Sequence, residues 1–140
     1  MPKNERNQDG IVIKVSGPVV DVRFPTNVPF VNEALIIELP NKSELVLEVA
    51  FETGDHEVKA LALGSTDGLS RGMKVKATGS PIKVPVGLPT LGRIFNVLGQ
   101  TIDEGGKLES KDLSYDKIHK PAPPLTEQET KPNILETGIK

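Results

Sequence analysis

Residues 45–52 read Leu-Val-Leu-Glu-Val-Ala-Phe-Glu, and their alternation decides the fold class of this chain. The apolar side chains at every second position from Leu45 to Phe51 are expected to face a core, and Glu48 and Glu52 to face water. A two-residue period is typical of a strand with one buried face, because successive side chains of a strand point to opposite sides. The stretch therefore predicts a half-buried β-strand.

Similar apolar runs flank this strand on both sides, and turn-forming residues separate them. The runs are residues 11–15, 20–24, 34–39, 58–63 and 73–77, and the turns contain Ser16-Gly17-Pro18, Pro40-Asn41-Lys42-Ser43, Gly54-Asp55 and Asp67-Gly68. Six short strands within about 70 residues favour a small closed barrel or a sandwich, because closure into a barrel removes the unpaired strand edges. The sequence therefore predicts a mainly β fold.

The same alternation predicts which side chains share a face of the sheet. Ile11, Ile13 and Val15 are expected on one side of the first run. Asp21 and Arg23 lie two apart on the outward face of the second run and are positioned to form an ion pair. At the surface such a pair would contribute about 0–1 kcal/mol to stability.

The pattern changes after Gly79. Residues 82–86 form a short extended piece, which Pro81 and Pro85 restrict to the edge of a sheet. The next apolar residues are spaced at i, i+3, i+4 and i+7 and predict a helix from Leu91 to Leu98. Thr90 is expected to cap the start of this helix, and Gly99 to take the left-handed conformation at its end.

Residues 107–132 are polar and rich in proline, so they are expected to run as an extended loop over another part of the protein. Ile134-Leu135-Glu136 is expected to be a short extended piece, and Thr137 is a suitable N-cap for a further helix. The sequence ends three residues later, before one helical turn could close. We therefore expect the chain to be a truncated piece of a longer protein.

The amino-acid composition disfavours several classes of function. A net charge of −2 and 4% aromatic residues disfavour a nucleic-acid surface, which needs positive charge and stacking rings. The absence of Cys excludes disulfides, a thiol nucleophile and Cys-ligated metals. The polar N-terminus lacks the apolar region of a secretory signal, and no apolar run approaches the ~20 residues that span a bilayer. These features predict a soluble, cytoplasmic protein.

The chain contains no motif that predicts chemistry. Its one Gly-Lys pair, Gly106-Lys107, is neither preceded nor followed by the residues of a phosphate-binding loop, and no Gly-x-Gly fingerprint occurs. His56 and His119 lack a second ligand at metal-binding spacing and are expected to be solvated. The serines considered as nucleophiles lie in turns, where Ser commonly makes local hydrogen bonds; they are Ser16, Ser65 and Ser80. We therefore predict no catalytic, cofactor-binding or metal-binding residue.

A set of short motifs nevertheless carries a specific resemblance. The motifs are Gly17-Pro18-Val19-Val20-Asp21-Val22-Arg23-Phe24-Pro25, Leu45-Val46-Leu47-Glu48-Val49-Ala50, Ser65-Thr66-Asp67-Gly68-Leu69 with Arg71-Gly72, Pro85-Val86-Gly87, Thr90-Leu91-Gly92-Arg93-Ile94, Asn96-Val97-Leu98-Gly99, Ile102-Asp103-Glu104, Ala122-Pro123 and Glu136-Thr137-Gly138-Ile139-Lys140. In this order they resemble the N-terminal part of the catalytic beta subunits of rotary F-type ATP synthases. Residues 65–72 resemble the beta type more than the related alpha, export and vacuolar subunits.

The resemblance implies a six-stranded closed β-barrel at residues 8–79, followed at 80–140 by the truncated start of an α/β nucleotide-binding domain. In the family, barrels of alternating alpha and beta subunits join into a crown that holds the hexamer together. The full-length subunit also contacts the central stalk, and produces ATP from ADP and phosphate with Mg²⁺, using a transmembrane proton gradient. It lies peripherally at the cytoplasmic face of an energy-coupling membrane.

The resemblance also implies that the phosphate-binding loop lies beyond Lys140, so that the 140-residue chain alone is expected to be inactive. Two other interpretations stay open. The chain could be a stand-alone binding or adaptor module, because small barrels often bind oligonucleotides or partners. It could also be a genuine short product that caps or regulates subunit assembly.

Overall fold

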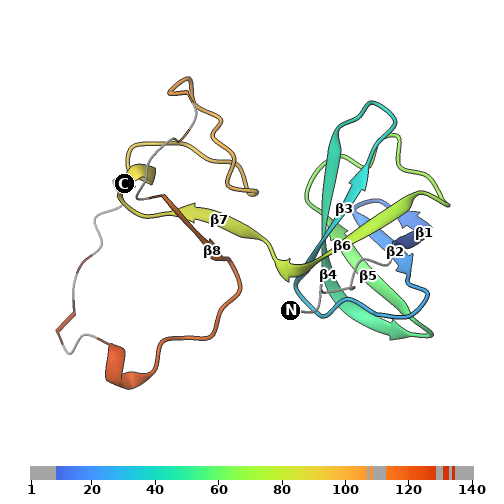
Figure 1. The fold of residues 1–140 in the computed structure, drawn as a ribbon, viewed down its shortest axis with the longest axis horizontal. Helices are drawn as coiled ribbons and strands as arrows, with labels where there is room; N and C mark the ends of the chain where they lie inside the picture. Colours follow the sequence, from blue (N-terminus) through green and yellow to red (C-terminus); the bar gives the residue numbers. More distant parts are fainter. Residues whose placement is uncertain (1–8, 107, 109–112, 129–130, 133, 135–140) are drawn as a thin grey trace, which may run out of the picture.

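The computed structural model describes residues 9–106, 108, 113–128, 131–132 and 134. Six antiparallel strands close a barrel in the order β1-β2-β5-β4-β3-β6 (Figure 1). These strands are β1 (Gly10–Ser16), β2 (Val19–Arg23), β3 (Glu33–Glu38), β4 (Glu44–Gly54), β5 (Glu57–Ala62) and β6 (Lys74–Pro81). The described part of the chain is mainly β with almost no helix, and the prediction of a small six-stranded closed barrel is confirmed.

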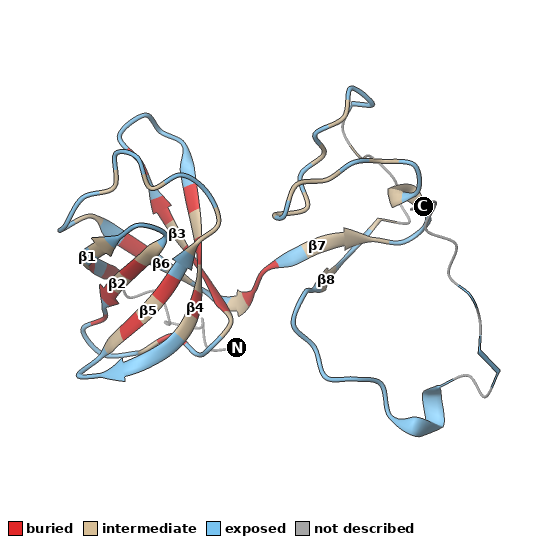
Figure 2. Cartoon of the chain, turned by 180° about the vertical axis from the view of Figure 1, so that it is seen from behind, coloured by how far each residue is buried: buried red, intermediate tan, exposed pale blue. Residues whose placement is uncertain are grey.

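The hydrophobic core is formed by the barrel strands and the residues beside them, and Figure 2 shows the buried residues concentrated in the barrel. Every barrel strand contributes at least one side chain to it. The largest fully buried side chains are Phe24, Leu35, Ile37, Leu47, Val12, Val20, Val22, Val49, Val58 and Val75. Burying one such side chain contributes about 1.5–3 kcal/mol, so this core is the main source of the barrel's stability.

One predicted inward residue of β4 points outward. Leu45, Leu47 and Val49 are buried as expected, but Phe51 is 51% exposed. The pairing with β5 shifts after Val49, so that one extra residue is inserted before Phe51. Such a β-bulge reverses the alternation from that point onward, and the prediction for Phe51 was therefore wrong.

A second bulge explains the error in β1. The pairing with β2 shifts between Val12 and Lys14, so Ile11 and Val15 lie on opposite sides of the bulge. Val12 is fully buried and Val15 packs against the core, whereas Ile11 is 49% exposed. The prediction that Ile11, Ile13 and Val15 share one face is therefore wrong, because an inserted residue changes the face of the residues beyond it.

The second part of the described chain, residues 82–106, 108 and 113–128, is called the arm. It contains a two-stranded antiparallel sheet of β7 (Lys83–Val86) and β8 (Ser114–Lys117), and the two 3₁₀ helices η1 (Leu88–Thr90) and η2 (Leu125–Glu127). In Figure 1, β7 leads away from the barrel and β8 returns toward it. The predicted edge piece at 82–86 is confirmed, but β8 lies within a segment that was predicted to be a loop.

The helix predicted from Leu91 to Leu98 does not form. The backbone leaves the 3₁₀ turn at Leu91 in an extended conformation, with φ −65° and ψ 135°. Asn96 then accepts hydrogen bonds through Oδ1 from the backbone N–H groups of Leu98, at 3.0 Å, and Gln100, at 2.9 Å. Asn side chains compete in this way with helical hydrogen bonds, so the tight turn wins over the apolar spacing.

Both residues that were predicted to cap this helix have other roles. Thr90 donates its hydroxyl to the carbonyl of Gly87 at 2.7 Å instead of accepting from helix amides. Gly99 does take a left-handed φ of 74°, but it closes the Asn96 turn. A Cβ on Gly99 would lie 2.5 Å from Cδ of Pro85, so this glycine is also needed for the close approach to β7. The expected N-cap at Thr137 lies outside the described residues.

Candidate functional site

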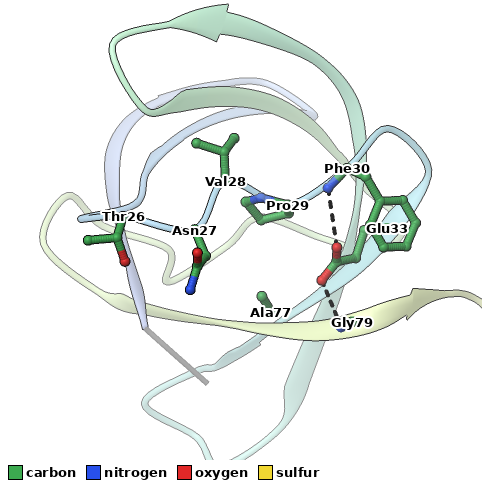
Figure 3. Close-up of a pocket in the computed structure, with 8 residues that line it drawn as sticks. All are labelled: Thr26, Asn27, Val28, Pro29, Phe30, Glu33, Ala77 and Gly79. Carbon is green, nitrogen blue, oxygen red and sulfur yellow. Dashed lines mark hydrogen bonds between the residues drawn. The ribbon is translucent and has the colours of Figure 1, made fainter. Parts of the chain in front are cut away.

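A hollow of about 300 Å³ lies at one mouth of the barrel (Figure 3). It is lined by the loop that precedes β3 and by the end of β6; the residues are Thr26, Asn27, Val28, Pro29, Phe30, Glu33, Ala77 and Gly79. It is the part of the barrel in which a buried charged side chain borders open space. It is therefore the strongest candidate in the barrel for a site of chemistry.

Glu33 is the buried charged residue, with 4% of its surface exposed. Its carboxylate accepts a hydrogen bond from the backbone N–H of Gly79 at 2.7 Å and another from the backbone N–H of Phe30 at 3.2 Å. Figure 3 shows the two oxygens turned toward these two segments. Because both oxygens already have donors, Glu33 joins the loop to the end of β6 and is poorly placed to act as a general base.

The hollow contains no further group that would support catalysis. Its other polar side chains are those of Thr26 and Asn27, and no His, Ser or Cys lines it. Nucleophilic catalysis needs a nucleophile beside an activating base, which this set of residues does not supply. Across the residues that the structure describes, no group of three or more His, Cys, Asp or Glu side chains is placed to hold a metal ion.

The histidines considered from the sequence both make a polar contact. Nδ1 of the exposed His56 lies 3.1 Å from the carbonyl oxygen of Thr26. Nε2 of His119 lies 3.0 Å from a carboxylate oxygen of Glu48 and is half-exposed. His119 is therefore not simply a solvated histidine, because it joins the arm to the barrel.

The serines considered from the sequence make local hydrogen bonds where the structure records them. Ser65 donates its hydroxyl to Asp67 at 2.7 Å and accepts from the backbone N–H of the same residue at 3.2 Å. Ser80 donates to the carbonyl of Pro81 at 3.3 Å. The hydroxyl of Ser65 and the carboxylate of Asp67 form a local turn two residues apart, which agrees with the interpretation of Ser65 as a turn residue. Ser16 and Ser80 lie in β1 and β6 instead, so their interpretation as turn residues is wrong.

The outer face of the barrel carries two cross-strand ion pairs. Lys59 Nζ lies 2.7 Å from Asp21, and Arg23 Nε donates to Glu57 at 2.9 Å. The expected pair between Asp21 and Arg23 is therefore wrong, because each side chain pairs with the residue directly opposite it on β5. Exposed apolar residues accompany these pairs on the barrel surface; they are Ile11, Phe51 and Leu61.

The arm has one strongly organised polar cluster. Arg93 donates two hydrogen bonds of 2.7 Å to the carboxylate of Asp103, one from Nε and one from Nη2. Asp103 also accepts from the backbone N–H groups of Ile94, at 3.0 Å, and Gly105, at 3.1 Å. The guanidinium of Arg93 first, and then these amides, hold the pKa of Asp103 far below its usual range. Residues 93–106 are thereby fixed as one closed loop.

Most of the large apolar side chains that are exposed in the described residues belong to this arm. They include Leu88, Leu91, Ile94, Val97, Ile102, Tyr115 and Leu125. Leu88 is 81% exposed, although the loop that follows it has a fixed backbone. Exposed apolar side chains gathered on one segment indicate a surface that packs against another part of a protein.

None of the described helices has the length and apolar character that crossing a membrane requires. Comparison with protein families gives a match that covers residues 12–79, from the first strand of the barrel to the sixth. The matching model is that of the ATP synthase alpha/beta family, beta-barrel domain. This family includes both subunit types, so the match does not separate alpha from beta. The closed barrel of this chain is therefore similar to the beta-barrel domain of the ATP synthase alpha/beta family.

Proposed function

We propose that this chain is the N-terminal portion of a catalytic beta subunit, and that its barrel serves the assembly of an alpha/beta hexamer. The observation that carries the proposal is the family match of residues 12–79, which coincides with a closed barrel. The motif Ser65-Thr66-Asp67-Gly68-Leu69 supports the beta type, because it resembles beta subunits more than alpha subunits.

The arm supports an origin from a larger subunit. Its apolar side chains are exposed, and its polar groups are used internally, as in the Arg93–Asp103 pair. A segment of this kind needs a covering surface, and the nucleotide-binding domain of a full-length subunit would supply one. The full-length protein would produce ATP from ADP and phosphate with Mg²⁺, at the cytoplasmic face of an energy-coupling membrane, and would contact the central stalk.

Within that protein the barrel would make contacts between subunits and take no part in the reaction. The hollow at the barrel mouth has one carboxylate, and two backbone amides already satisfy it. We therefore expect the pure 140-residue chain to show no ATP hydrolysis and no saturable nucleotide binding by calorimetry. Micromolar affinity for ATP would contradict this part of the proposal.

Association with separate subunits tests the assembly role. The pure chain is mixed with a purified alpha subunit of a bacterial F-type ATP synthase, and the mass of the product is measured by size-exclusion chromatography with light scattering. A complex with alpha, and none with a purified beta subunit, is the expected result. Absence of any complex, with the barrel shown to be folded by circular dichroism, would contradict the proposal.

The same samples address the alternative of a stand-alone binding module. Fluorescently labelled single-stranded DNA and RNA are titrated with the chain at low salt, where charge-driven binding is strongest. The net charge of −2 leads us to expect no binding. Saturable oligonucleotide binding without association with alpha would favour the stand-alone module.

A further inference from the structure

The arm is joined to the barrel covalently at one crossing, between β6 and β7. Pro81 ends β6, and Ile82 follows it with 6% of its surface exposed. A segment held at a single crossing can rotate about the backbone of a few residues, as in hinge motions. The direction of the arm is therefore fixed only if a second contact reaches the barrel.

The returning strand of the arm ends beside this crossing. The ladder between β7 and β8 ends with Lys83 opposite Lys117, on the side of the barrel. The next residue, Ile118, donates its backbone N–H to the carbonyl of Ile82 at 3.0 Å. The chain after β8 is thus held beside the crossing point (Figure 1).

His119 then reaches the wall of the barrel. Its Nε2 lies 3.0 Å from Oε2 of Glu48, which stands on the outward face of β4. Glu48 lies opposite Ala34 on β3 and Leu61 on β5, so its backbone is fixed by a neighbour on each side. The side chain of His119 on the arm therefore contacts a carboxylate whose strand is paired on both sides.

We propose that His119 and Glu48 form a latch that holds the returning strand against the barrel and so fixes the direction in which the arm leaves it. Both are positioning residues. The latch acts together with the Ile118–Ile82 hydrogen bond, and opening it frees the arm to turn about residues 81–83. This inference is independent of the subunit identity proposed above, since it concerns only contacts within the chain.

Amide hydrogen exchange of the full 140-residue chain, followed by NMR, tests the latch. The reporter is the Ile118 amide, because its hydrogen bond to Ile82 ends the β7–β8 ladder on the side of the barrel and lies one residue from His119. We expect His119→Ala and Glu48→Ala each to accelerate its exchange about two- to fivefold, the range that a polar contact at the surface supports. Exchange of the Val22 and Val58 amides in the barrel core should stay unchanged, which shows that the variants fold.

Matched controls remove a charge near the latch without touching it. Lys120→Ala removes the partner of Asp116 within the arm, and Glu52→Ala removes an exposed carboxylate from β4. Both should leave Ile118 exchange at the wild-type rate. An acceleration by these controls equal to that of His119→Ala would overturn the proposal, because the effect would then not be specific to the pair.

The double variant distinguishes a coupled pair from two separate effects. If His119 and Glu48 act through each other, the variant with both changes exchanges no faster than either single variant. The exchanged pair, Glu48→His with His119→Glu, should recover part of the lost protection. Single variants without effect, or a double variant whose acceleration is the product of the two singles, would refute the latch.

Discussion

At position 33 a carboxylate lies where a simple barrel strand would have an apolar side chain. Burying such a group is unfavourable unless its oxygens are hydrogen-bonded, and here the amides of Phe30 and Gly79 supply the donors. The carboxylate thereby joins the loop before β3 to the far end of β6. Glu33 is in this way a structural link at the mouth of the barrel.

Replacing Glu33 by Ala should lower the free energy of unfolding by about 1–3 kcal/mol, because two part-buried hydrogen bonds to a charged group would be lost. Urea denaturation followed by circular dichroism measures this change. Glu38→Ala is the matched control, since Glu38 is exposed at the other end of the same strand, and it should stay within about 0.5 kcal/mol of the wild type. Equal effects of the two changes would contradict the assigned role of Glu33.

The contacts of individual side chains were the part of the structure that the sequence predicted least well. Glu33 precedes an apolar run, and a charge in that place is ordinarily assigned to the surface. Asp21 and Arg23 were paired from their spacing, but their true partners on β5 depend on the strand register. Contacts between residues far apart in the sequence are set by pairing, which alternation within one strand does not specify.

Among the elements of the arm, the loop at 93–106 is the most firmly fixed. The carboxylate of Asp103 receives the guanidinium of Arg93 and two backbone amides, and Arg93 also donates to the carbonyl of Gly106 at 2.6 Å. A bidentate pair of this kind has a defined geometry as well as a favourable energy. It explains how the loop stays closed although its apolar side chains are exposed.

The pKa of Asp103 should be far below the value of about 3.9 for an unperturbed Asp. A depressed folded-state pKa stabilises the closed loop above the unfolded-state pKa, and this contribution is lost as the pH falls below about 4 toward the folded-state pKa. Carboxyl carbon NMR should therefore find Asp103 still ionised at about pH 3. Arg93→Gln should move its titration upward, and Arg71→Gln, which is remote from the loop, should not.

The strands and their buried faces were predicted correctly wherever apolar and polar residues alternate without interruption. Val20, Val22 and Phe24 are buried as the pattern indicates, and so are the first alternating residues of β4. The errors fall at the bulges before Phe51 and after Val12, where one inserted residue reverses the faces. The predicted helix failed for a different reason, because the side chain of Asn96 forms a turn within the apolar spacing.

At the scale of the whole molecule, the barrel and the arm differ in how they are stabilised. The barrel has a buried core, and the arm is held by hydrogen bonds and by the β7–β8 ladder. Local opening is easier where few apolar groups are buried. The arm should therefore open far more often than the barrel.

Limited digestion with chymotrypsin should cut first in the arm, at exposed sites such as Leu91 and Leu125, and leave the barrel intact. Mass spectrometry identifies the fragments. In the variant Leu47→Ala the barrel should also become cleavable, because a cavity at this fully buried position costs about 2–5 kcal/mol. An arm that resists digestion as long as the wild-type barrel would contradict this account.

The architecture of the barrel could be predicted from the strand count and turn spacing, but that of the arm could not. β8 reads Ser-Tyr-Asp-Lys, a polar sequence without a buried face, so no hydrophobic pattern marks it. β8 pairs with β7 only because the chain folds back alongside β7, and nothing in the local sequence indicates this return. The boundaries expected at 8–79 and 80–140 stay predictions, although the six barrel strands lie between Gly10 and Pro81.

Closure of the barrel has a consequence for self-association in concentrated solution. Each barrel strand has a neighbour on both sides, so its main chain offers no free rim to an added strand. Within the described residues, β7 and β8 pair only with each other, so each of these strands has one unpaired edge. Pro85 has no N–H to donate, so it hinders the pairing of a strand from another molecule with β7. The unpaired edge of β8 is therefore the place where such a strand could add to the sheet.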